Sequence, residues 1–374
     1  MKAKKSFFLL VVTLCTLMAE TDYGVENTNI TISPENQDIY NYNRLRLSFS
    51  YEQNGFFSTF IGDGVNYYSK EYIASQEFTF LKQNHSDTPF ETQSSFYTYD
   101  EGVAYTKIYR AYVGYEDLRN RVVAGVQNIP MGVGHIFNPV NVYNPQNIYA
   151  IEPDEVYGVA ALSYTNFLSD TSQVNFILSQ REDYSYEVAL RYKAFVKYAD
   201  IGLDVITSDK LKMFAYEIEG NLADTGIELR SEGAYITTTL KESTKTYTKE
   251  FSQVMLGGDY GFENGVALAV ELLYSSATFS YEQMVLNFDS QSVQNFVDAT
   301  FSVGLSFSYD INLFLGSSFI YVKNNKTDFF SPALSYTLND FNSFTLGAML
   351  DNSDDGSSLR SSQDVYYFKY LLSF

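Results

Sequence analysis

Apolar and polar residues alternate along most of this chain, with the period of two that is typical of β-strands whose two faces meet different surroundings. Three segments show it most clearly, at 184–192, 266–274 and 301–309, where an apolar or aromatic residue recurs at every second position. The pattern predicts about eighteen strands. They lie near 43–52, 55–65, 75–85, 102–116, 119–128, 155–167, 172–181, 184–198, 199–208, 212–222, 225–239, 250–261, 265–279, 297–309, 312–323, 329–338, 343–352 and 364–374.

The first and last predicted strands show what the two faces carry. In Asn43–Glu52 one face has Leu45, Leu47, Phe49 and Tyr51, and the other has Arg44, Arg46, Ser48 and Ser50. In Asp364–Phe374 one face is wholly apolar and consists of Tyr366, Phe368, Tyr370, Leu372 and Phe374. A soluble protein seldom leaves such a strand at a sheet edge, because it would template aggregation. A barrel closed in lipid needs an oily outer face and a last strand that pairs with the first.

The connections between the predicted strands differ in length in a regular way. Connections after even-numbered strands are mostly tight, whereas the long ones all follow odd-numbered strands, at 86–101, 129–154, 240–249, 280–296 and 353–363. Long loops on one side are typical of outer-membrane barrels, in which both chain ends face the periplasm. The segment 66–74 is the exception. A count of about sixteen strands stays open, because the alternation is weak over 55–85 and 199–222.

The start of the chain has the pattern of a secretory signal peptide. Lys2, Lys4 and Lys5 precede the apolar stretch Ser6–Met18, and Ala19 is small enough to precede a cleavage site. We predict a signal peptide over 1–19, a polar periplasmic leader over 20–41 and one barrel domain over 42–374. The single cysteine, Cys15, falls in the signal peptide, so disulfides contribute nothing to the mature chain.

Composition narrows the class of protein. Aromatic residues make up 17% of the 374 residues, yet the mean hydropathy is only -0.17. No apolar run after the signal peptide approaches the ~20 residues of a membrane-spanning helix, which excludes a helical membrane protein. A formal net charge of -20 argues against nucleic acid as a partner. Together with the alternation, these values predict an all-β transmembrane antiparallel barrel. A soluble β-sandwich or adhesin is the alternative.

The segment 129–154 is rich in residues that preset turns, namely Gly132, Gly134, Pro130, Pro139, Pro145 and Pro153. The pairs Asn138-Pro139 and Asn144-Pro145 mark two turns, and Glu152, Asp154 and Glu155 add carboxylates at its end. A segment so constrained has little conformational entropy left to lose. We therefore expect this third extracellular loop to stay ordered inside a wet lumen and to narrow it. The alternative is an ordered extracellular loop that never enters the pore.

The residues around this segment resemble those of porin-like outer-membrane barrels. The resemblance spans residues 125–162 and lies in Gly125-Val126-Gln127, Gly132-x-Gly134-x-x-Phe137-Asn138-Pro139-x-Asn141-x-x-Asn144-Pro145 and Gly158-Val159-x-Ala161-Leu162. Met131 and Asn141 stand where that group often has an aromatic residue and an aspartate. The terminal Phe374 resembles the signal that the barrel-insertion machinery reads. The resemblance implies the outer membrane of a Gram-negative bacterium, contact with its lipid and, as in general porins of this size, a homotrimer.

Charged residues fall on the faces opposite the apolar stripes, where charges meet water instead of lipid. The basic ones are Arg44, Arg46, Arg110, Arg121 and Arg191, and the later strands carry Glu217, Glu219, Glu228, Arg230 and Glu271. Opposed charges across a narrow lumen produce a transverse field that acts on ions and dipolar solutes. We hypothesise a water-filled pore with a mild cation preference. Paired lumen residues without selectivity are the alternative.

Catalysis finds little support in the sequence. The two histidines, His85 and His135, lie in predicted loops, so a nucleophile on a strand has no histidine base beside it. They also lie too far apart in the sequence for a metal-site pattern. We expect no enzyme activity, no metal and no cofactor.

These observations predict a channel for passive diffusion of small hydrophilic solutes or ions, narrowed by the loop at 129–154. Two alternatives stay open. One is a channel specific for one substrate or for hydrophobic solutes, and the other is a structural or adhesive barrel without transport.

Overall fold

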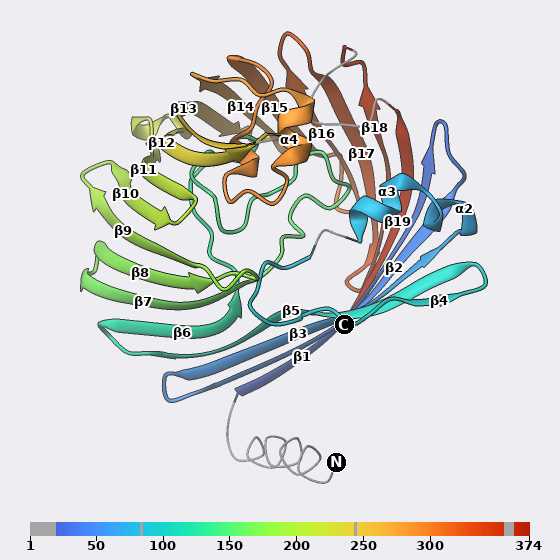
Figure 1. Cartoon of the computed structure of the whole chain (residues 1–374), viewed down its shortest axis with the longest axis horizontal. Coiled ribbons are helices and arrows are strands. Elements are labelled where there is room, and N and C mark those ends of the chain that lie inside the picture. The colour runs from blue at the N-terminus through green and yellow to red at the C-terminus, as the bar shows by residue number, and fades with distance from the viewer. Residues whose placement is uncertain (1–19, 83–84, 243–244, 355–362) are drawn as a thin grey trace.

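The computed structural model describes residues 20–82, 85–242, 245–354 and 363–374, and the predicted signal peptide over 1–19 lies outside them. Antiparallel strands form one sheet that closes on itself (Figure 1). The strands are β1 (Glu20–Pro34), β2 (Tyr40–Gln53), β3 (Phe56–Tyr68), β4 (Tyr97–Tyr99), β5 (Gly102–Glu116), β6 (Asn120–Gln127), β7 (Val159–Ser169), β8 (Ser172–Gln180), β9 (Tyr186–Val196), β10 (Ala199–Ser208), β11 (Leu211–Asn221), β12 (Ile227–Lys241), β13 (Thr246–Gly261), β14 (Val266–Ser275), β15 (Phe301–Asp310), β16 (Leu315–Lys323), β17 (Asp328–Asn339), β18 (Asn342–Asp351) and β19 (Val365–Ser373). Short helices lie in the connections: α2 (Lys70–Ile73), α3 (Gln76–Leu81), α4 (Tyr281–Leu286) and the 3₁₀ turns η1 (Ala223–Thr225) and η2 (Val293–Asn295).

Closure of the barrel joins the two ends of the described chain. β19 pairs with β1 along a register that runs from Glu26↔Ser373 to Pro34↔Val365, and β1 pairs with β2 on its other side. β3 and β5 pair directly, so β4 lies outside the ring and, in the described part of the chain, pairs with the end of β5 alone. The ring therefore has 18 strands, as the sequence predicts.

The prediction of a periplasmic leader over 20–41 is wrong, because most of this segment is the strand β1. Over its second half, from Asn27 to Ser33, its polarity is reversed relative to the other strands. Ile30 and Ile32 are buried on the inner side of the barrel, in a cluster with Tyr40 and Tyr67. On the opposite face Asn29 exchanges side-chain hydrogen bonds with Asn41 of β2. Because this half has polar residues at its outward positions, it gave no signal of a lipid-facing strand.

The prediction of a strand at 75–85 is also wrong, because Gln76–Leu81 forms the helix α3. The Ser75 side chain caps this helix by accepting a hydrogen bond from the Phe78 backbone N–H at 3.1 Å. Phe78 is fully buried and packs on the rings of Tyr67 and Tyr72. The alternation of Phe78 and Phe80 imitated a strand. One strand lost and one gained leave the predicted count unchanged.

The connections are divided by length between the two ends of the barrel. Those at 69–101, 128–158, 276–300 and 352–364 all emerge at one end, which we call the long-loop end. The other, short-turn end has connections of five residues or fewer and carries Phe374. The predicted long connection at 240–249 shrinks to 242–245, because β12 and β13 continue pairing to Lys241↔Thr246. The exception at 66–74 disappears with the misassigned strand.

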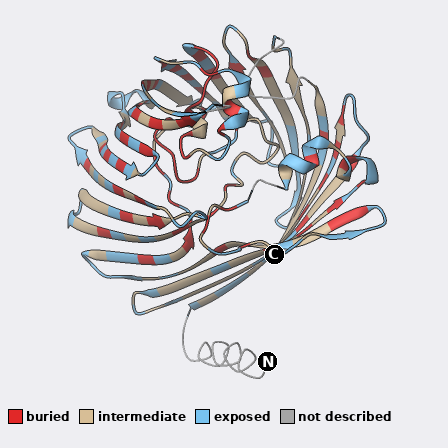
Figure 2. Cartoon of the chain, in the orientation of Figure 1, coloured by how far each residue is buried: buried red, intermediate tan, exposed pale blue. Residues whose placement is uncertain are grey.

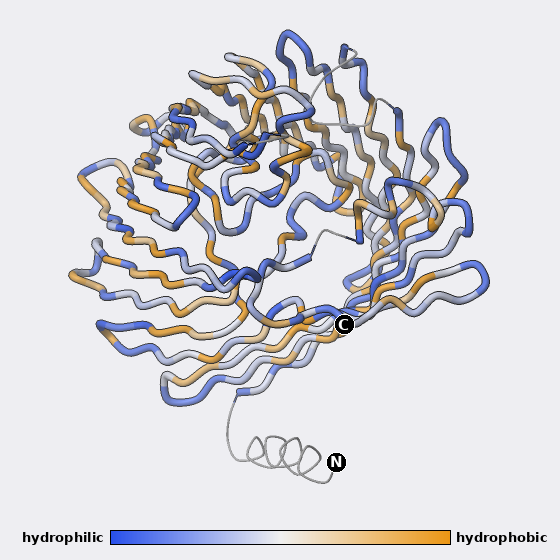
Figure 3. Tube along the Cα trace, viewed as in Figure 1, coloured by the Kyte–Doolittle hydropathy of each residue, from blue (hydrophilic) through white to orange (hydrophobic). Residues whose placement is uncertain are grey.

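Hydrophobic and hydrophilic residues alternate along the strands (Figure 3), and the two faces of the sheet differ accordingly. On β14, Val270, Leu272 and Tyr274 are 40%, 51% and 39% exposed on the outside, whereas Glu271 and Leu273 are buried on the inside. Leu45 and Leu47 of β2 are likewise exposed, and Arg44, which precedes them on the opposite face, is buried. Among the described residues no helix is long and apolar enough to cross a membrane.

Candidate functional site

The connection 128–158, called loop 3 below, lies inside the ring of strands (Figure 1). Most of its residues up to Asn144 are buried (Figure 2). It is the third connection at the long-loop end, after 35–39 and 69–101. Its contacts with inward-facing side chains define how it is held.

Three carboxylates of the barrel wall hold the first half of loop 3 by its backbone. We call them the wall glutamates: Glu217 of β11, Glu232 of β12 and Glu271 of β14. Each is at most 1% exposed. They accept hydrogen bonds from the backbone N–H groups of Gly132 (2.7 Å, to Glu217), Val133, Gly134 and Val140 (2.5, 3.0 and 3.2 Å, to Glu232), and His135, Ile136 and Phe137 (2.7, 2.9 and 2.8 Å, to Glu271). A charge-assisted hydrogen bond to a carboxylate is stronger than a neutral one, so these contacts fix the path of the backbone.

Two glycines allow the backbone to approach the wall so closely. Gly132 has a φ of +81°, a conformation that residues with a Cβ rarely adopt. A Cβ at this position would also meet the side chains of Asn138 and Glu232. A Cβ on Gly134 would meet the carbonyl oxygen of Phe137. Gly132 therefore makes room for the Glu232 carboxylate, and Gly134 makes room for the turn of the loop itself.

Three asparagines stabilise the turns of loop 3 from within. Asn138 accepts a hydrogen bond from the Asn141 N–H at 3.0 Å, and Asn141 accepts one from the Asn144 N–H at 3.2 Å. Asn144 accepts from the Ile129 N–H and donates to the Tyr157 carbonyl, which joins the two ends of the loop. The repeated Asn-Pro turns predicted from the sequence are built by these contacts.

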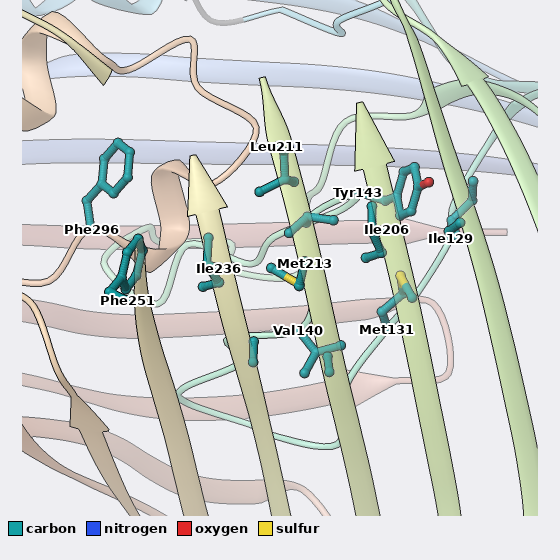
Figure 4. Close-up of a cluster of buried hydrophobic side chains, with 14 of the residues drawn as sticks. Ile129, Met131, Val140, Tyr143, Ile206, Leu211, Met213, Ile236, Phe251 and Phe296 are labelled. Carbon is teal, nitrogen blue, oxygen red and sulfur yellow. The ribbon is translucent and has the colours of Figure 1, made fainter. Parts of the chain in front are cut away.

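Apolar residues of loop 3 pack against the same side of the wall (Figure 4). Ile129, Met131 and Val140 belong to one buried cluster with side chains of β10, β11 and β12, among them Ile206 and Met213. Each buried aliphatic side chain contributes ~1.5–3 kcal/mol relative to exposure. The loop is thus attached by its backbone polar groups and its apolar side chains together.

The second half of loop 3 is held on the other side of the barrel, and here its own side chains are the ones attached. Glu152 accepts from Arg44 of β2 at 3.1 Å and from Lys369 of β19 at 2.7 Å. Glu155 accepts from Arg46 at 2.8 and 2.9 Å. Burial disfavours the charged form of Glu155, but the hydrogen bonds from Arg46 and the charge of Arg44 outweigh it and hold its pKa below the ordinary value. Loop 3 therefore spans the interior from one wall to the opposite one.

A second connection supports loop 3. The segment 276–300 contains α4 and places Asn295 so that its side chain donates to the Pro139 carbonyl at 2.9 Å. Asn295 also donates to Gln253 of β13 at 2.7 Å, and both side chains are buried. Phe296, next in the chain, joins the apolar cluster under loop 3.

The residues predicted as lumen charges face inward, and several of them touch loop 3. Arg110 donates to the Val156 carbonyl at 2.9 Å, and Arg191 donates to the Pro130 carbonyl at 3.0 Å and pairs with Glu217. Arg230 is buried among Glu228, Asp259 and Glu271. Glu219 lies two positions from Glu217 on β11.

Two other predicted residues do not join this network. Arg121 lies near the short-turn end, where it pairs at 3.4 Å with Glu116, and both side chains are nearly half exposed. Asp154 is exposed and accepts from Gln146 within the loop at 2.9 Å.

The charges are compensated locally. Arg46 pairs with Asp63 of the neighbouring strand at 2.7 Å, and Arg44 pairs with Glu26 of β1 at 3.0 Å. The acidic sector in turn contains Arg191 and Arg230. This arrangement corresponds to the alternative of paired lumen residues, so an opposed field between two walls is not its main feature.

Sequence reasoning missed several members of the network, above all Glu232, Asp63 and Lys369. Glu232 continues the inward face of Glu228 and Arg230 at the next alternate position, so the alternation itself could have identified it. Lys369 shares the inward face of the C-terminal strand with Tyr367. Tyr366, Phe368 and Phe374 point outward, with 51%, 46% and 67% exposure, as predicted; Tyr370 and Leu372 share their face.

The described residues do not form a candidate metal site. Among the described residues there is no group of three or more histidines, cysteines or carboxylates arranged to hold a metal ion. The His85 Nε2 lies 3.9 Å from the Glu182 carboxylate, and the His135 backbone N–H donates a hydrogen bond to Glu271.

Comparison with known proteins shows the fold. No protein-family model matches the sequence, and no curated protein matches it. The barrel is similar to crystal structures of outer-membrane porins of the Occ type. Pseudomonas aeruginosa OccD3 (OpdP) matches with a TM-score of 0.60 at 10% identity, over 95% of this chain and 91% of that one. Acinetobacter baumannii OccAB1 matches with 0.61 at 10% identity, over 95% and 96%. Pseudomonas aeruginosa OpdK with vanillate matches with 0.62 at 8% identity, over 95% and 98%.

Proposed function

We propose that this protein is a channel of the Gram-negative outer membrane through which small hydrophilic solutes and ions diffuse passively, and that loop 3 sets its narrowest section. The single observation that carries the proposal is a closed barrel, apolar outside and polar inside, with a loop fastened across its interior at both walls. In this orientation the short-turn end faces the periplasm and the long-loop end faces the outside.

The mechanism needs no chemistry and no cofactor. Solutes exchange part of their hydration for the polar side chains of the wall and of loop 3. Because loop 3 is held by wall glutamates on one side and by Arg44, Arg46 and Lys369 on the other, the width of the passage is fixed without a moving part. A rigid constriction of this kind selects by size and by the charge around it.

We further propose a mild cation preference. Its support lies at the short-turn end, in a cavity of about 1150 Å³ whose charged lining is mainly acidic. The carboxylates there are Glu20, Asp22, Glu52, Glu116, Asp117 and Asp170, against Arg119 and Arg121. A mouth lined by one sign of charge raises the local concentration of the opposite ion.

Current recordings in planar lipid bilayers test both the channel and its cation preference. We expect purified protein to give discrete conductance steps and a reversal potential of the cation-selective sign in a salt gradient. The double variant Asp22→Asn/Glu52→Gln moves that potential toward zero with the conductance retained. Absence of conductance contradicts the channel and favours the structural or adhesive alternative. An anion-selective wild type contradicts the charge preference alone.

A substrate-specific channel is the second candidate, favoured by the similarity in fold to OpdK, whose structure contains vanillate. Vanillate added to the bilayer chamber discriminates between the two. A saturable block of the current supports a specific site, whereas a current that is unaffected supports general diffusion.

Assembly is part of the same proposal. We propose that the insertion machinery reads the C-terminal strand through Phe374 and that the mature protein contacts outer-membrane lipid as a homotrimer. Heat-modifiable gel migration of the protein in the membrane fraction, and loss of this behaviour in Phe374→Ala, test the insertion signal. Measurement of the mass in detergent tests the homotrimer.

A further inference from the structure

One sector of the barrel wall, beside the main contacts of loop 3, has an uncharged inner face. The inward positions of β15, β16 and β17 are serine, glycine, alanine, threonine or apolar over 302–308, 316–322 and 329–337, with no charged residue in these segments. The arginines and glutamates of the wall that hold loop 3 lie on other strands, namely β2, β5, β9, β11, β12 and β14. This uncharged sector therefore adjoins loop 3 without taking part in the charged contacts that hold it.

Ile136 and Ile148 of loop 3 contact the upper part of this sector. A Cβ on Gly304 of β15 would lie 2.7 Å from Ile136 of loop 3. Ile136 and Ile148 form a buried cluster with Val322 and Phe329. The loop therefore rests on β15, β16 and β17 at this level.

Below that contact the loop leaves a cavity of about 600 Å³, which is within the usual size of small-molecule sites. Tyr260 and Gly261 at its lower edge adjoin the turn 262–265, so the cavity extends toward the short-turn end. Loop 3 contributes His135, Ile148, Ala150, Ile151 and Pro153. The opposite side is the wall of β13 to β17 with Tyr367 of β19.

Four serine hydroxyls line the wall side of the cavity, on Ser306, Ser308, Ser318 and Ser331. Ser308 and Ser318 are cross-strand partners. Ser306 and Ser331 flank Ile320 on its two neighbouring strands. Within the described part of the chain none of these four hydroxyls makes a hydrogen bond. Each can therefore donate and accept toward a solute.

The charge that borders the cavity is already neutralised. Asp259 lines its edge, but the Arg230 guanidinium lies 2.6 Å from the Asp259 carboxylate. The cavity thus presents hydroxyls on one side and aliphatic surface from Ile148, Ile151 and Pro153 on the other. Two such surfaces suit a small uncharged molecule that has hydroxyl groups and an apolar face.

We propose that the passage runs through this cavity and that the four serines bind uncharged, polyhydroxylated solutes as these leave loop 3. The inference rests on the proposed channel function and adds the route and the solute class to it. The hydroxyls replace the hydration shell of the solute step by step, and the lack of free charge leaves ions unbound there.

The route is tested by placing one thiol in the cavity. Apart from Cys15 of the predicted signal peptide the chain has no cysteine, so Cys15→Ser provides a background without thiols. In this background, Ser318→Cys in a planar bilayer is exposed to a neutral methanethiosulfonate reagent. We expect the current to fall irreversibly. Ala189→Cys is the matched control, because Ala189 is fully buried under loop 3, and its current stays constant.

The solute class is tested with mannitol as the probe. Swelling of liposomes in mannitol reports its flux, and the potassium chloride conductance of the same preparation reports ion flow. We expect Ser318→Ala to weaken mannitol binding, so that the mannitol flux saturates at about five-fold higher concentration, the effect of losing one neutral hydrogen bond. The ion conductance, measured alongside, shows that the variant barrel is open.

The outcomes separate this inference from the proposed function. A wild type without conductance overturns the channel itself. A conducting channel whose Ser318→Cys current resists the reagent overturns the route. A reactive Ser318→Cys combined with unaltered mannitol flux in the alanine variant overturns the binding role of the serines.

Discussion

The two halves of loop 3 are held by opposite chemistry. In the first half the loop supplies backbone N–H groups and the wall supplies the charges, whereas in the second half the loop supplies Glu152 and Glu155 and the wall supplies arginine and lysine. The backbone contacts need only a close approach, which Gly132 and Gly134 permit. The side-chain contacts need particular residues on both sides.

This difference determines how each half responds to change. The wall glutamates are at most 1% exposed, so solvent and salt screen their hydrogen bonds little. The side chains of Glu152 and Glu155 are 13% and 24% exposed, so their ion pairs are weakened more by salt and by acid. We expect the first half to be the fixed part of the constriction and the second half to be the adjustable part.

The largest effect is expected from Glu232→Leu. The substitution leaves the N–H groups of Val133, Gly134 and Val140 without an acceptor, and each buried unpaired group costs ~1–3 kcal/mol. The first half of loop 3 then leaves the wall, the thermal stability falls and the single-channel conductance rises. Glu228→Gln is the control, because Glu228 lies on the same face of β12 but is 35% exposed and pairs only with Arg230 among the described residues. An unchanged conductance in a folded Glu232→Leu barrel would disprove the role of this carboxylate.

Gly132→Ala is expected to act somewhat less strongly on the same half. Alanine there adopts a left-handed conformation at a cost of ~1–2 kcal/mol, and its Cβ also displaces Asn138 and Glu232. Gly226→Ala is the matched control, since Gly226 has a φ of +74° and its Cβ would lie 3.4 Å from the nearest atom, in Tyr260. Denaturation of both variants in detergent measures the difference. Equal destabilisation would show that the close approach to Glu232 contributes nothing.

Arg44→Gln is expected to act on the second half with a smaller effect on stability. Loss of this cation leaves Glu26, Glu152 and Glu155 less well compensated. Because these carboxylates are partly exposed, water screens them and the cost falls as salt rises. The pore gains net negative charge, so the reversal potential moves further toward cation selectivity. Lys323→Gln is the control, because Lys323 is 49% exposed and pairs with Asp328 outside the loop 3 network. A shift of equal size in both variants would contradict a specific role for Arg44.

The smallest effect is expected from acid acting on Glu155. Its pKa is lowered in the folded protein, so the stabilisation is complete above the ordinary carboxyl pKa of about 4.3 and is lost as the pH falls through the lower folded value. Conductance should therefore stay constant from about pH 7 to pH 5 and change only below about pH 4. Glu155→Gln removes this acid-dependent change, and Asp154→Asn, at an exposed position, retains it. A transition that persists in Glu155→Gln assigns it to another group.

Much of the barrel is predictable because its signal is local. Each strand shows its two faces by alternation, and the turn chemistry of loop 3 is visible in Asn138, Asn141 and Asn144. The two wrong predictions, at β1 and at α3, also have physical causes. β1 turns its apolar residues Ile30 and Ile32 inward, so its pattern lacks the lipid-facing stripe, and α3 alternates by chance over a single turn.

The sequence by itself determined the class of fold, the position of most strands and the side on which the long connections lie, since these follow from periodicity and from the spacing of turns. The tertiary structure decided which groups meet inside the barrel. Glu217 binds Gly132 across 85 positions in the chain, and Glu271 binds His135 across 136. Such partners are set by closure of the ring and by the depth to which loop 3 enters it, and no local pattern encodes either.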